Sequence, residues 1–212
     1  MKARGAWLLV IGVLAAGAAL AQKAAEPERL RGVVARADAS SLIIRTRDGQ
    51  SMRLALAPNL AVFSLTKASF ADLDFGTYVG SVSERMGDNI YSPIYRDSLS
   101  WLYRGLELRI IDESLRGIAV GHTKWDLTAA SVITHGWVDD IEDRVISIKY
   151  GPTDQEETDV EISRDIPVLK MSLGDRSLLK PGAHVVVGVH KGPESALAVF
   201  VFVGKDGVVP AL

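Results

Sequence analysis

The sequence contains an internal repeat, and the repeat limits which folds are possible. Gly32-Val33-Val34 recurs as Gly136-Trp137-Val138, about 104 residues later, and the stretch 42–47 recurs at 145–150. Self-similarity at a fixed spacing indicates that one structural unit has been built twice. Any fold for this chain therefore has to place two copies of the same element pattern.

Short strands separated by turn residues make up each copy. In the first copy, apolar residues alternate over 32–37 and 52–57, and Asp48-Gly49 between them is a strong signal for a tight hairpin. Ser69 with a carboxylate three residues later predicts a single helical turn that ends at Gly76. Two further strands are expected after this turn.

Five strands with one helical turn between the third and the fourth is the order of a small OB-like Greek-key barrel. We therefore predict an all-β protein of two tandem OB-like barrels, each with one short helical turn. The first barrel is expected at 30–115 and the second at 135–212, joined by a linker at 116–134. A single larger sandwich built from the same ten strands is the alternative, because a β chain of this length can form one domain.

Residues 1–21 have the composition of an export signal. Lys2 and Arg4 precede a short apolar run that ends in Ala19-Leu20-Ala21. This arrangement predicts a secretory signal peptide, followed by a flexible leader at 22–29. We expect a periplasmic protein with no stable membrane insertion after cleavage, and an uncleaved membrane anchor is the alternative.

Charge and composition exclude several classes of function. The 212 residues include 24 basic and 26 acidic side chains. The chain therefore lacks the excess of positive charge that would favour a nucleic acid as its partner. The absence of cysteine excludes disulfides, thiolate metal sites and cysteine nucleophiles. No stretch matches the common hydrolase, P-loop or zinc-protease motifs. We expect neither enzyme activity nor a cofactor, and a hydrolase at the junction of the repeats is a distant alternative.

The two copies differ most between their fourth and fifth strands. The second copy needs only 191–195 there, whereas the first has an insertion at 85–105. Loops carry function on rigid scaffolds, and aromatic side chains with arginine are typical of protein interfaces. The insertion therefore predicts a partner-binding surface made of Tyr91, Tyr95, Arg96, Trp101 and Tyr103. The alternative is a lid that folds back over its own barrel.

A second candidate site lies between the copies. His122, Trp125 and Asp126 follow a glycine-rich turn, where they could bind a ligand at the junction or lock the two barrels together. His122 is also a candidate metal ligand together with His135, since only histidine supplies nitrogen donors for a transition metal in this chain.

A third candidate site lies on the expected second and third strands, the surface that OB-like barrels use for ligands. Arg45, Arg47 and Arg53 occupy odd positions there and should share one side of the hairpin. An anionic ligand could bind these side chains, and an exposed polar sheet surface without a ligand is the alternative.

The linker carries a resemblance to a known family. It reads Arg116-Gly-Ile-Ala-Val-Gly121-His122-Thr-Lys-Trp125-Asp126-Leu127. This resembles exported two-repeat OB-like proteins of unknown function from alphaproteobacteria, in which the linker is approximately R-G-x-G-x-G-H-x-x-W-D-L. Such relatives are often labelled metal ABC transporter permeases. The resemblance implies a fold and a location, and it supplies no catalytic residues.

These observations together favour a non-enzymatic periplasmic binding or assembly protein. It would use its barrels to engage an envelope protein or a small ligand. A periplasmic metal-handling accessory protein is the main alternative, which the label of the resembling family suggests.

Overall fold

The computed structural model describes residues 26–88, 90–94, 101–153, 156–192 and 196–210. The described chain is all-β, as predicted, and the expected signal peptide lies outside it. Among the described residues, no helix is long and apolar enough to span a membrane. The strands in chain order are β1 (Glu28–Ala37), β2 (Ser41–Thr46), β3 (Ser51–Lys67), β4 (Tyr78–Arg85), β5 (Leu102–Ile111), β6 (Gly121–Lys124), β7 (Val132–Glu142), β8 (Val145–Lys149), β9 (Glu157–Glu161), β10 (Val168–Leu173), β11 (His184–Lys191) and β12 (Ala196–Gly204).

The local turn signals are confirmed. The tight turn between β2 and β3 contains Gly49 with φ 84°, a conformation that glycine adopts without strain. A 3-10 turn, η1 (Phe70–Asp72), precedes β4, and the Asp72 carboxylate accepts the backbone N–H of Ser69 at 2.8 Å. The equivalent turn of the second copy is η3 (Arg176–Leu178), which precedes β11. A third short turn, η2 (Glu113–Leu115), follows β5.

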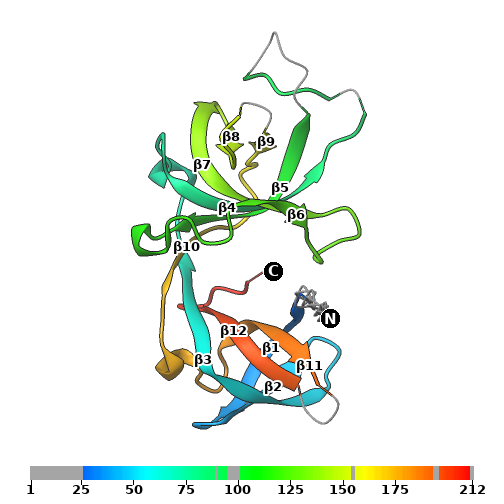
Figure 1. The fold of residues 1–212 in the computed structure, drawn as a ribbon, viewed down its shortest axis with the longest axis vertical. Helices are drawn as coiled ribbons and strands as arrows, with labels where there is room; N and C mark the ends of the chain where they lie inside the picture. Colours follow the sequence, from blue (N-terminus) through cyan, green and yellow to red (C-terminus); the bar gives the residue numbers. More distant parts are fainter. Residues whose placement is uncertain (1–25, 89, 95–100, 154–155, 193–195, 211–212) are drawn as a thin grey trace, which may run out of the picture.

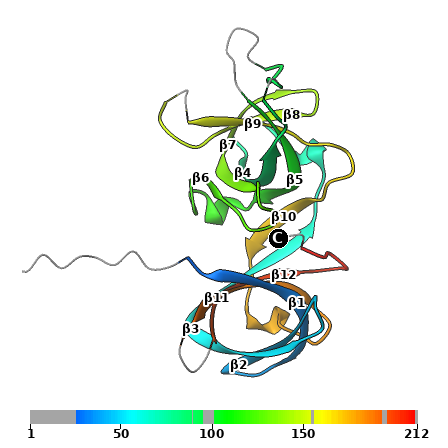
Figure 2. The same ribbon diagram turned by 90° about the vertical axis from the view of Figure 1, so that its right-hand side faces the viewer.

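The strands pair into two closed rings (Figures 1 and 2). The first ring is a five-stranded barrel in the order β1, β2, β3, β12 and β11, with β3 and β12 parallel and the other pairs antiparallel. The second ring runs β7, β8, β9, β5 and β4, and a short parallel pairing of β5 with β9 closes it. β10 lies between the rings and pairs with β3 and β5.

This pairing corrects the prediction of two tandem barrels. The first ring combines β1–β3 of the first copy with β11 and β12 of the second, and the second ring combines β7–β9 with β4 and β5. The exchange of strands follows from the length of β3, which has 17 residues and extends past its ring. Its last residues pair with β10, from Phe63 opposite Leu173 to Lys67 opposite Leu169. The chain therefore enters the other ring before its fourth strand begins. The segment 116–134, expected as a linker, contains β6 and the start of β7.

Apolar side chains fill the interior of each ring and the space between the rings. The first ring encloses Leu42, Ile44 and Val187, and the second encloses Ile146 and Val160, all fully buried. Burying one such side chain stabilises a fold by about 1.5–3 kcal/mol. Each core draws on residues from both halves of the sequence.

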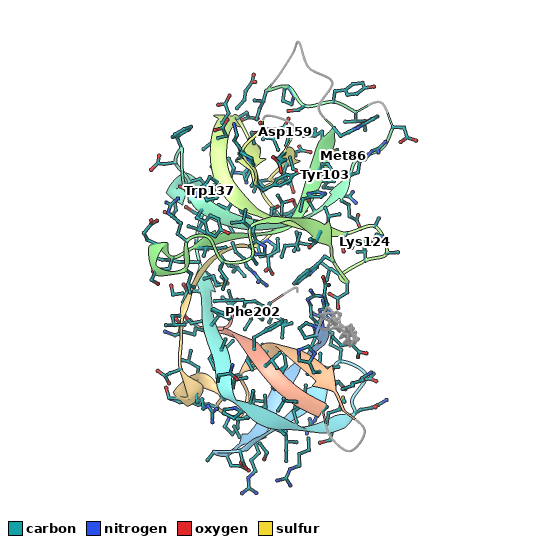
Figure 3. All side chains as sticks on the ribbon, in the orientation of Figure 1. Met86, Tyr103, Lys124, Trp137, Asp159 and Phe202 are labelled. Carbon is teal, nitrogen blue, oxygen red and sulfur yellow. The ribbon has the colours of Figure 1, made fainter. Side chains whose placement is uncertain are left out.

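The space between the rings also holds a buried ion pair. Arg109 donates to Glu107 at 2.8 Å, and both side chains are almost fully buried. The guanidinium of Arg109 lies 4.3 Å from the ring centre of Phe202, which packs between the two rings (Figure 3). Burial of Arg109 lowers its pKa, and Glu107 opposes that shift.

Candidate functional site

Arginine side chains gather on the outer surface of the first three strands. Ile44 points into the first ring, so by alternation Arg45 points outward, and Arg53 shares its side of the hairpin. Ile43 lies between Arg36 and Arg53 in one cross-strand row. We call this surface the arginine face, and it consists of Arg31, Arg36, Arg45, Arg47 and Arg53.

A pocket of about 230 Å³ opens on the arginine face. The side chains with ionisable groups that line it are Arg31, Arg45, Arg47 and His184. Gly32 also lines the pocket, and a Cβ atom at this position would come within 2.3 Å of the backbone oxygen of Arg45. The close approach of β1 and β2 at this point therefore requires glycine.

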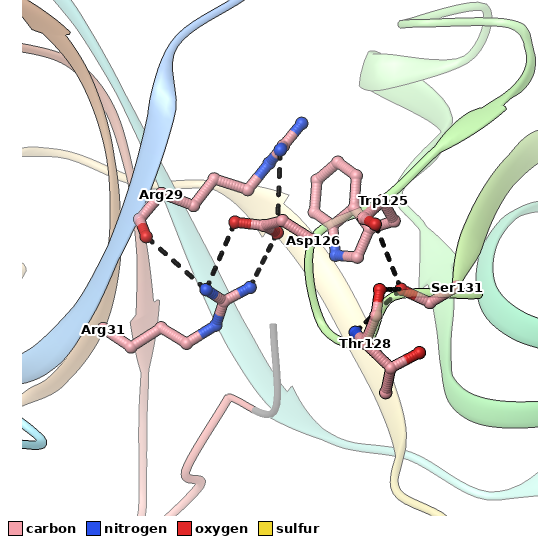
Figure 4. A network of polar contacts seen from close by, with 6 residues as sticks. All are labelled: Arg29, Arg31, Trp125, Asp126, Thr128 and Ser131. Carbon is pink, nitrogen blue, oxygen red and sulfur yellow. Dashed lines mark hydrogen bonds and ion pairs between the residues drawn. The ribbon is translucent and has the colours of Figure 1, made fainter.

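Two arginines of β1 share one carboxylate next to the pocket (Figure 4). Arg31 donates to both carboxylate oxygens of Asp126, at 2.9 and 3.3 Å, and Arg29 lies 3.6 Å from the same group. The guanidinium of Arg29 also lies 3.5 Å from the ring centre of Trp125. Burial lowers the pKa of Arg29, and Asp126 opposes this shift. One negative charge thus faces two positive charges.

The other pocket arginines have no such partner. Within the described part of the chain, no carboxylate forms an ion pair with Arg45 or Arg47, and both side chains are exposed. A guanidinium presents paired N–H donors that match the oxygens of a carboxylate or a phosphate. The pocket therefore offers an anion two charged donors that the protein does not already use.

The three residues predicted at the junction do not form one site. Trp125 and Asp126 contact β1 of the first ring, whereas His122 lies against the second ring. Nδ1 of His122 is 2.9 Å from Oγ1 of Thr134, and the imidazole stacks on Tyr150 with ring centres 5.5 Å apart. Burial lowers the pKa of His122.

The two histidines predicted as metal ligands are not brought together. His122 bonds to Thr134 on one side of β7, and His135 is the next residue, so its side chain points to the opposite side. Burial and the nearby Arg109 lower the pKa of His135 to about 4. In the described ranges, no group of three or more His, Asp or Glu side chains could hold a metal ion.

Part of the predicted partner-binding insertion is described. Tyr91 and Trp101 stack with ring centres 5.2 Å apart, and the guanidinium of Arg85 lies 3.8 Å from the ring centre of Trp101. The rings of Tyr103 and His122 instead pack edge to face, and burial raises the pKa of this tyrosine. Tyr95 and Arg96 lie outside the described residues. A role of the insertion in docking stays a prediction.

Sequence reasoning missed part of the pocket. Arg31 occupies an odd position before Val33, so its place on the arginine face could have been read from strand parity. His184 belongs to the fourth strand of the other copy and pairs with Val33 only because the strands are exchanged. No local signal could have placed it there.

Comparison with known proteins gives no relative. No protein-family model, no curated protein and no solved structure matches this chain.

Proposed function

We propose that this chain is a non-enzymatic binding protein whose first ring holds an anionic ligand. The observation that carries the proposal is the pocket whose lining includes Arg31, Arg45 and Arg47. Among the described residues, Arg45 and Arg47 have no carboxylate partner. Hydrogen bonds from a charged donor to an anion contribute about 1.5–3 kcal/mol each. A carboxylate or phosphate group is the ligand chemistry that fits.

The strand order of the first ring supports an OB-like plan. Three antiparallel strands are followed by a parallel neighbour, β12, and then by β11, which follows the helical turn η3. The second ring repeats this order with β7–β9, β5 and β4. We infer that both rings are OB-like barrels with exchanged fourth and fifth strands. Barrels of this kind bind ligands across their second and third strands, where Arg45 and Arg53 lie.

The location of binding is part of the proposal. The export signal expected at 1–21 favours the periplasm. The anionic group would then belong to a small ligand or to an acidic segment of an envelope protein. Binding of this kind needs no catalytic group and no cofactor.

Isothermal titration calorimetry with pyrophosphate and with citrate tests the proposal. Arg45→Gln removes one guanidinium from the pocket and should weaken binding of at least one probe about tenfold or more. Arg164→Gln is the matched control, because Arg164 is exposed on the loop between β9 and β10. Absence of binding by both probes, or an equal loss in the control, would overturn the proposal.

A further inference from the structure

The same cross-strand row carries opposite charges in the two copies. In β1, β2 and β3 the row is Arg36, Ile43 and Arg53. In β7, β8 and β9 it is Asp140, Ser147 and Asp159. Both rows follow a bulge in their first strand, so they occupy equivalent places in the repeat.

The inversion extends over both three-strand segments. Residues 28–57 contain six arginines and three acidic residues, so their formal charge is +3. Residues 132–161 contain nine acidic and two basic residues, so their formal charge is −7. A chain whose total charge is only −2 therefore carries two three-strand segments of opposite formal charge.

The exposed acidic side chains cluster at the hairpin between β7 and β8. Among the described residues of this segment they are Asp140, Glu142 and Asp143, which we call the acidic hairpin. Asp159 of the same row is fully buried and does not contribute to the surface. Asp140 and Glu142 are two residues apart, as are Arg45 and Arg47, so each pair spans about 7 Å along its segment.

The hairpin strands that carry the two surfaces lie toward opposite ends of the molecule. β2 is at one end of the long axis, and β8 and β9 are at the other, in both views (Figures 1 and 2). The acidic hairpin therefore cannot neutralise the arginine face of its own chain. A second copy can bring the two surfaces together.

We propose that copies of this chain associate head to tail, with the arginine face of one copy bound to the acidic hairpin of the next. The inference rests on the proposed function, because it uses the same arginine face and names a second copy as its partner. Two different surfaces that meet in this way form a heterologous contact, which builds a ring or an open chain of several molecules. Attraction between exposed charges makes the contact sensitive to salt.

Sedimentation velocity of the full chain measures this association. In low salt the average mass should rise beyond a dimer as the protein concentration increases, and in about 0.5 M NaCl it should fall to that of a monomer. A monomer at every concentration in low salt, or an association that salt does not affect, would overturn the inference.

Two neutralised variants identify the surfaces. One carries Arg36→Gln, Arg45→Gln and Arg53→Gln, and the other carries Asp140→Asn, Glu142→Gln and Asp143→Asn. Each should be monomeric alone, and an equal mixture should form only a heterodimer, because one intact surface remains on each partner. Asparagine keeps the acceptor that Asp140 offers to the N–H of Ile141, and it tolerates the positive φ of Asp143, so the fold is retained.

A control separates this contact from general charge effects. The variant Arg164→Gln with Asp165→Asn changes two exposed charges elsewhere and should associate as the unaltered chain does. A mixture of the two neutralised variants that stays monomeric contradicts the head-to-tail contact. If the chain is monomeric but still binds pyrophosphate through Arg45, only the self-association fails; if neither occurs, the proposed function fails as well.

Discussion

Between the two rings, His135 and Gly80 face each other on neighbouring strands. A Cβ atom at Gly80 would lie 2.7 Å from Cδ2 of His135 and 2.8 Å from its Nε2, so glycine leaves room for the imidazole. Burial, together with the positive charge of Arg109, lowers the pKa of His135 to about 4. The neutral imidazole is therefore the form that the folded protein accommodates.

This histidine should make stability depend on pH. A histidine in the unfolded chain titrates near pH 6.5, so between that pH and about 4 the unfolded state binds the additional proton. The stability present above pH 6.5 is lost as the pH falls through this window, by roughly 3 kcal/mol in total. Urea unfolding measured at several pH values checks this. His135→Gln should flatten the dependence, and an unchanged slope in this variant contradicts the assignment.

At the scale of elements, the loop between β6 and β7 connects the two rings. Its Trp125 and Asp126 contact β1, and Oγ of Ser131 holds the loop by donating to the carbonyl oxygen of Trp125 at 3.2 Å (Figure 4). The Asp126 side chain is 41% exposed, so its ion pairs contribute only about 0–1 kcal/mol to stability. Their more important consequence is that Arg31 is shared between this loop and the pocket.

Removing the charge of Asp126 should therefore strengthen anion binding. Asp126→Asn keeps the shape of the side chain but releases Arg31 from its ion pair, so the affinity for pyrophosphate should rise several-fold. The free energy of unfolding should fall by no more than about 1 kcal/mol. Calorimetry and urea unfolding measure the two effects. Asp165→Asn, at an exposed carboxylate elsewhere, should change neither, and weaker binding by Asp126→Asn would show that the anion does not reach Arg31.

For the whole molecule, the exchange of strands makes each ring depend on both halves of the chain. Neither copy contains the five strands of one ring, since β11 and β12 complete the first ring and β4 and β5 complete the second. Such an arrangement should unfold in one cooperative transition, because neither core survives without the other half.

An engineered disulfide tests the pairing of β3 with β10. Ser64 and Ser172 are Cα partners on β3 and β10, and the natural chain has no cysteine. Ser64→Cys with Ser172→Cys should form a disulfide within one chain and increase the free energy of unfolding by about 2–4 kcal/mol. Mass spectrometry and urea unfolding, each with and without reductant, provide the measurement. The pair Ser64→Cys with Ser163→Cys is not adjacent and should stay reduced, and disulfides found only between chains would contradict the exchange.

Residues close together in the sequence specify the local elements of this protein. Strand alternation, the Asp48-Gly49 turn and the capping of η1 and η3 depend on residues close in the chain, so the all-β class and the shared face of Arg45 and Arg53 could be predicted from it. Which strands close each ring, and hence the position of His184 at the pocket, depends on contacts between distant parts of the chain. The physical reason is that the two copies offer similar strand edges, so local patterns do not distinguish pairing within a copy from pairing between copies. The length of β3 and its pairing with β10 make that choice, and both are long-range properties of the folded chain.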